Sequence, residues 1–122
     1  MTQIFVQTLG LRGGMKSLAA RAMEGNAGAQ RELARRYFEE EGTRYDREGV
    51  TQNYELAAQL WRLAADQGDA DAQWELSVRY WEGEGVQQDK TESIRLLHLA
   101  ANQGHDDAQF ELGCSYWDGD GV

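Results

Sequence analysis

Few residues in this chain of 122 have the types and spacing that catalysis or metal binding requires. The two histidines, His98 and His105, are too few and too scattered for a metal site or a catalytic triad, and we expect both to be solvated. Residues 117–121 resemble part of a calcium loop but lack the later ligands. Cys114, the single cysteine, lies in no basic setting and is expected to pack as a small apolar residue. We therefore predict no catalytic residue, metal site or cofactor, and the chain is not expected to be an enzyme.

Recognition by large apolar side chains is the chemistry that the sequence favours instead. Two helical segments carry a second apolar face, about 200° from their packing face at 3.6 residues per turn. This face holds Trp74, Val78 and Trp81 in one segment and Phe110, Cys114 and Trp117 in the other. Large aromatic residues in a groove are typical anchors of a binding interface. The alternative is that Trp74 and Phe110 only stack across neighbouring helices.

In an earlier helical segment, the positions that correspond to Trp74, Val78 and Trp81 are occupied by Arg31, Arg35 and Phe38. That end of the predicted groove would be basic, and it would suit an extended peptide whose carboxylate or acidic side chain is held by the two arginines. The alternative is ordinary pairing along the helix, because Arg35 and Glu39 have salt-bridge spacing.

The elements that position these residues belong to an internal repeat. Residues 71–86 return as 107–122, with Ala72 matched by Ala108 and Leu76 by Leu112. A fixed period between about 20 and 50 residues marks a solenoid or an array of supersecondary units. Function is therefore expected on a surface of the repeats.

The repeat predicts six helices in antiparallel pairs. Three first helices are expected at 26–40, 69–82 and 105–118, two second helices at 53–67 and 89–103, and one preceding helix at 15–24. Asn53 is a good N-cap, and Asp89 followed by Glu92 has the spacing of a capping box. Gly68 and Gly104 are suitable helix stops.

The predicted domain covers residues 15–122 and divides into a capping half-repeat (15–25), a first repeat (26–68), a second repeat (69–104) and a partial third repeat (105–122). The first repeat is longer by seven residues than the 36-residue spacing of Ala72 and Ala108, which places an insertion within 39–48. A loop and an extended helix remain alternatives. Residues 1–14 resemble the first strand of ubiquitin joined to its terminal Leu-Arg-Gly-Gly, which favours a tag remnant over a native arm.

A family resemblance is carried by the repeated Ala, Leu, Tyr and Gly positions and by the alanine-rich second helix. These are Ala72, Leu76, Tyr80, Gly83, Gly85, Val86, Asp89, Leu97, Ala100, Ala101 and Gly104. The chain thereby resembles the Sel1-like repeat family, which is related to the tetratricopeptide repeats. Ser77 and Ser93 depart from the pattern. The resemblance implies an all-α, right-handed α/α superhelix that acts as a non-catalytic, protein- or peptide-binding scaffold or adaptor, often in bacteria.

The composition of the chain disfavours some classes of binding partner. The net charge of −9 and pI near 4.6 disfavour nucleic acid and anionic membranes, which would repel the chain. No apolar run is long enough to span a bilayer. We expect a cytoplasmic protein, or a periplasmic or secreted one if a signal segment has been removed. The alternative function is self-assembly, through a C-terminal helix that no second helix covers, or a role as part of a longer repeat protein.

Overall fold

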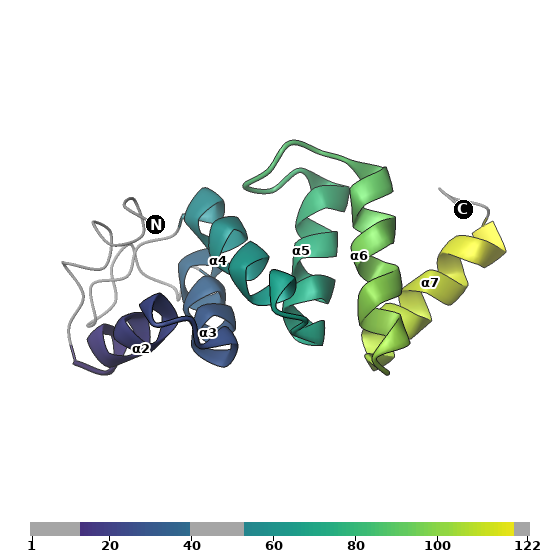
Figure 1. Ribbon diagram of the computed structural model, residues 1–122. Coiled ribbons are helices and arrows are strands. Elements are labelled where there is room, and N and C mark those ends of the chain that lie inside the picture. The colour runs from purple at the N-terminus through teal and green to yellow at the C-terminus, as the bar shows by residue number, and fades with distance from the viewer. Residues whose placement is uncertain (1–12, 40–52, 119–122) are drawn as a thin grey trace.

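The computed structural model describes residues 13–39 and 53–118, and every element in them is a helix. The helices are α2 (Gly13–Met23), α3 (Ala27–Phe38), α4 (Tyr54–Asp66), α5 (Ala70–Glu82), α6 (Lys90–Asn102) and α7 (Asp106–Asp118). They follow one another along a row, each packed on the next (Figure 1). The predicted all-α solenoid of six helices is confirmed.

Two predicted regions fall largely outside this description. The arm was expected to end at residue 14, but α2 already begins at Gly13, and residues 1–12 lie outside the described residues. The insertion expected within 39–48 is described only at Glu39. None of the described helices is long and apolar enough to cross a membrane.

Side-chain caps begin the second helices as the sequence predicts. The Asn53 side chain accepts the N–H of Leu56 at 3.0 Å, and the Asp89 side chain accepts the N–H of Glu92 at 3.0 Å. The predicted capping box is only half formed, because the Asp89 N–H donates to the carbonyl of Tyr80 at 2.9 Å. Glu92 is thus available to bind arginines instead of its own helix terminus.

The core consists of alanines, leucines and two large aromatic side chains. Its largest fully buried members are Trp61, Tyr37, Leu33, Leu56, Leu60, Leu76 and Leu96. A second, smaller cluster lies between α6 and α7 and contains Leu97, Ala100, Ala101 and Ala108. Small residues at these positions let successive helices approach closely, and the leucines fill the space between them.

A ladder of glutamines, of which Gln30 and Gln73 are buried and the others exposed, links successive repeats. The first-helix glutamines donate to carbonyls of the preceding helix at 3.0–3.2 Å: Gln30 to Ala22, Gln73 to Ala65 and Gln109 to Ala101. The second-helix glutamines donate to these in turn, Gln67 to Gln30 and Gln103 to Gln73, both at 2.8 Å. Each repeat therefore satisfies polar groups of its neighbour, as buried polar groups require.

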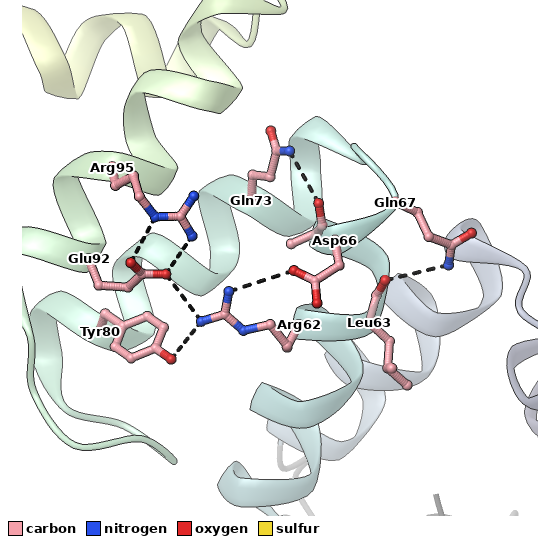
Figure 2. A network of polar contacts seen from close by, with 9 residues as sticks. Arg62, Leu63, Asp66, Gln67, Gln73, Tyr80, Glu92 and Arg95 are labelled. Carbon is pink, nitrogen blue, oxygen red and sulfur yellow. Dashed lines mark hydrogen bonds and ion pairs between the residues drawn. The ribbon is translucent and has the colours of Figure 1, made fainter.

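An arginine ties three successive helices together. Figure 2 shows Arg62 of α4 donating to the Tyr80 hydroxyl at 2.6 Å and to Glu92 of α6 at 3.3 Å. Arg95 binds the same carboxylate at 2.6 and 2.8 Å. Hydrogen bonds from Arg95 first, and from Arg62 as well, lower the pKa of Glu92. The side chains of this network therefore bind one another and link the two repeats.

The two serines that depart from the family pattern contact the same helix. The Ser93 hydroxyl donates to the carbonyl of Ser77 at 2.6 Å, and the Ser77 hydroxyl donates to the carbonyl of Trp74 at 2.6 Å. Both serines are buried. The Ser93 bond joins α6 to α5, whereas the Ser77 bond lies within α5, and both serines line the second cavity described below.

Candidate docking groove

Two cavities follow one another along α5 and α7. The first, of about 250 Å³, is lined by Arg31, Glu32, Arg35, Trp61, Asp71, Trp74, Glu75, His105 and Asp107. The second, of about 280 Å³, is lined by Ser77, Val78, Trp81, Glu82, Ser93, Ile94, Leu97, Glu111 and Cys114. The lining residues of α5 mostly recur at intervals of three and four, as do those of α7, so each helix contributes one stripe to a shared surface. We call the two cavities together the docking groove.

Several predicted binding residues meet in this groove. Trp74 is half-buried, and its ring stacks on that of His105 with centroids 5.5 Å apart. Val78, Trp81 and Cys114 line the second cavity, where the Lys90 ammonium lies 4.6 Å from the Trp81 ring centroid. The side chain of Trp117 lies outside the described residues.

Phe110 is not part of the groove, contrary to the prediction. It is 72% exposed and lines neither cavity. Trp74, its counterpart one repeat earlier, is covered by His105 at the start of α7, whereas α7 is the last described helix and no described side chain covers Phe110. The suggested stacking of Trp74 on Phe110 is therefore wrong, and self-association through α7 stays a prediction.

Phe38 belongs to the core and does not line the groove as predicted. Its ring stacks on Tyr54 at 4.7 Å and lies 5.5 Å from that of Trp61. The buried Arg79 guanidinium covers it at 4.0 Å. The prediction for Phe38 used only its position on the helix. That position does not determine whether Phe38 is exposed, because a side chain from the next repeat covers it.

The predicted basic end of the groove is neutralised by carboxylates. Arg31 pairs with Asp69 at 3.3 Å and with Asp71 at 3.2 Å. Arg35 pairs with Glu32 and with Glu39 at 2.7 Å, as the salt-bridge alternative predicted. Arg31 and Arg35 do line the first cavity, but neither offers an unpaired charge to an acidic ligand.

Two carboxylates of the groove lack such pairing. Glu75 and Glu111 are half-buried and form no ion pair with any described residue. Burial raises the pKa of Glu75, and the nearby Glu39 and Asp71 add to the rise against the opposing charge of Arg79. Burial likewise raises the pKa of Glu111. The Trp74 indole nitrogen opposes that rise, although it lies outside hydrogen-bond geometry.

Sequence reasoning missed these carboxylates, although they leave a signal. Glu32, Glu75 and Glu111 each stand directly before the repeated leucine, one in every copy. Of the three, only Glu32 has an ion pair with a described residue. Hydrogen bonding to Arg35 is the main cause that lowers the pKa of Glu32. An acidic residue that recurs at one position of the repeat indicates that the surface it lines is acidic.

Two further predictions about single residues are corrected. His105 is not solvated: its side chain is 11% exposed, its Nδ1 accepts the N–H of Ala108 at 3.2 Å, and its Nε2 contacts Asp71 at 2.9 Å. Since Nδ1 accepts, Nε2 carries the hydrogen that is donated to Asp71. Cys114 is exposed at the edge of the second cavity instead of packed. No cluster of three or more metal-ligating side chains occurs among the residues that the structure describes.

A larger cavity, of about 670 Å³, lies between α4 and the loop that connects α5 to α6. It is lined by other faces of these helices and contains none of the predicted binding residues. Its arginine, Arg62, already binds one of its two tyrosines, Tyr80. The docking groove is the better candidate because its tryptophans are only half-buried, and because Glu75 and Glu111 form no ion pair with a described residue.

Replacing Glu75 with glutamine is expected to raise the melting temperature at about pH 8. Because the folded-state pKa of Glu75 is raised above the ordinary 4.5, the folded protein binds this proton more tightly than the unfolded chain. Above the folded-state pKa the folded protein therefore bears the full penalty of the buried charge, and the penalty disappears as the pH falls toward 4.5. The gain in melting temperature should disappear over the same range.

Thermal unfolding followed by circular dichroism across this pH range tests the prediction. Glu24→Gln is the matched control, since it removes one carboxylate from an exposed position. A Glu75→Gln gain that is independent of pH, or equal to that of the control, would contradict it.

A row of antiparallel helix pairs with a groove along successive first helices defines an α/α helical-repeat protein. Residues 27–69, 70–105 and 106–122 each match the Sel1 repeat. The chain belongs to the Sel1 repeat family. Proteins of this family are generally non-catalytic scaffolds for protein interactions.

Two solved structures resemble this chain closely. One is c5321, described as a protective antigen of uropathogenic Escherichia coli with an SLR fold (TM-score 0.78, 36% identity); the match covers 91% of this chain and only 22% of c5321. The other is a Sel1 repeat protein from Oxalobacter formigenes (TM-score 0.74, 36% identity), covering 88% of this chain and 76% of that protein. Among curated proteins, no significant match to the chain was found.

Proposed function

We propose that this domain is a protein-interaction module that holds an extended segment of a partner in the docking groove. The observation that carries the proposal is that Trp74 and Trp81 are only half-buried, at the sides of two adjoining cavities. Tryptophans that a partner can bury further are among the most frequent anchors of protein interfaces. Family membership supports the general role, and the groove supplies a place for it.

Selection of a random displayed peptide library against the chain tests this function. Trp81→Ala is expected to weaken binding of the selected peptides by about tenfold or more, as truncation of an anchor residue does. Trp81 is preferable to Trp74 for this purpose, because Trp74 also packs on the cluster between α6 and α7. Fluorescence anisotropy with labelled peptides measures the change.

Leu99→Ala is the matched control, since Leu99 is an exposed apolar residue of α6 that lines neither cavity. It should leave peptide affinity unchanged, and both variants should keep the helical content of the parent. Selected peptides that bind the Trp81 variant as tightly as the parent, or a selection that yields no binders, would show that the groove is not the docking surface.

A further inference from the structure

The charges around the docking groove are unequal. Its linings hold two guanidinium groups and six carboxylates, the latter from Glu32, Asp71, Glu75, Glu82, Asp107 and Glu111. Arg31 and Arg35 are each bound by two carboxylates, including Asp69 and Glu39 from outside the linings. The groove is therefore acidic, although its arginines alone suggest the opposite.

Glu75 and Glu111 are the carboxylates with most to gain from a cation. They occupy the same repeat position on α5 and α7, one in the lining of each cavity. Their counterpart Glu32 has a cation, in Arg35 and more distantly in Arg36, whereas Glu75 and Glu111 have no such partner among the described residues. A half-buried carboxylate without a counter-ion is unfavourable, and an incoming cation that pairs with it removes that penalty.

Apolar surface accompanies both carboxylates. Trp74 lies beside Glu75 in the first lining, and Val78, Trp81 and Ile94 accompany Glu111 in the second. A lysine or arginine side chain combines a long apolar stem with a charged end, so it can cover such surface while its charge reaches a carboxylate. Trp81 already accepts the Lys90 ammonium on its ring in this manner.

We propose that the docking groove selects a partner segment carrying lysine or arginine side chains, with cationic groups seated against Glu75 and Glu111 and apolar residues over Trp74 and Trp81. This inference rests on the proposed function and names the chemistry of the partner. It replaces the acidic peptide that the arginines predicted from the sequence. Charge complementarity of this kind governs partner choice and the rate of association.

The probes are three short peptides with blocked ends that carry leucine alternating with lysine, glutamine or glutamate. At low salt the lysine peptide should bind about tenfold more tightly than the glutamine peptide, and the glutamate peptide most weakly. Added salt should reduce the lysine advantage, because exposed charges are screened. Isothermal titration calorimetry or fluorescence anisotropy measures all three affinities.

Glu75→Gln should reduce the advantage of the lysine peptide over the glutamine peptide several-fold, and the Glu75→Gln, Glu111→Gln double variant should abolish it. Glu24→Gln removes the same formal charge from an exposed position and should leave the advantage within about twofold of the parent. Neither substitution in the groove removes an ion pair between described residues, so both variants should fold, and circular dichroism checks this.

The outcomes separate the inference from the function on which it rests. If lysine and glutamine peptides bind equally and Trp81→Ala weakens both, the groove docks peptides but does not select cations, and the inference is wrong. If the glutamate peptide binds most tightly, the arginines select the ligand and the inference is also wrong. If no peptide binds, or none is sensitive to Trp81→Ala, both the inference and the proposed function fail.

Discussion

Replacing Trp61 with alanine is expected to lower the free energy of unfolding by about 3–5 kcal/mol, the range for truncation of a large buried aromatic residue. Trp61 is the largest fully buried side chain among the described residues, with 0% exposure. Its ring lies 5.5 Å from that of Phe38 and 5.4 Å from the Arg79 guanidinium. Alanine would therefore leave a cavity where α3, α4 and α5 meet. Since domains of this size are stable by only about 5–15 kcal/mol, the effect should be visible as a large shift in the urea midpoint.

Trp61→Phe is the control that separates the effect of lost side-chain volume from the effect of losing the polar indole N–H. The indole N–H of Trp61 has no hydrogen-bond partner among the described residues, so phenylalanine loses ring volume but no hydrogen bond. Its expected effect is about 1–2 kcal/mol. A Trp61→Ala variant within about 1 kcal/mol of the parent would show that the core does not depend on this ring.

Replacing Gly85 with alanine should destabilise the protein by about 3–4 kcal/mol, from backbone strain and overpacking together. Gly85 has φ +79°, a conformation that side chains disfavour. An added Cβ would also overlap the carbonyl oxygen of Tyr54 and lie 2.6 Å from its carbonyl carbon. Both Tyr54 atoms belong to the backbone at the start of α4 and cannot move aside as a flexible side chain could. The loop between α5 and α6 therefore cannot keep its contact with that helix.

Gly68→Ala is the matched control for Gly85→Ala. Gly68 has φ +92°, but nothing lies within 4 Å of an added Cβ, so only the backbone strain of about 1–2 kcal/mol applies. Urea denaturation of both variants measures the difference, which isolates the contact with Tyr54. Equal destabilisation by the two substitutions would show that this close approach is unimportant for stability.

Local patterns were sufficient for the helices and for much of the core. Ala72 and Leu76, two positions that mark the repeat, are fully buried, and Asn53 and Asp89 cap the helices that they precede, as predicted. These features depend on residues within one or two helical turns, and the repeat presents them more than once. Of the residues that these patterns grouped together, Trp74 lines the first cavity and Val78 and Trp81 line the second.

The chemistry of that surface could not be predicted from local patterns. Arg31 finds its partners Asp69 and Asp71 on the following repeat, and Phe38 is covered by Arg79 from the following first helix. A helical frame gives the direction of a side chain but not the groups that a neighbouring helix places against it. Predictions for these residues therefore failed where the next repeat intervened.

The sequence by itself determined that this is a Sel1-type helical repeat with an aromatic face, because periodicity, caps and turn glycines act within a repeat. Only the tertiary structure decided whether the side chains that line the groove carry a net positive or a net negative charge. It paired the arginines with carboxylates and left Glu75 and Glu111 half-buried, with no ion pair to any residue in the described part of the chain. The physical reason is that pairing and burial of charge depend on contacts between repeats, whereas the helices that bring them together are specified within each repeat.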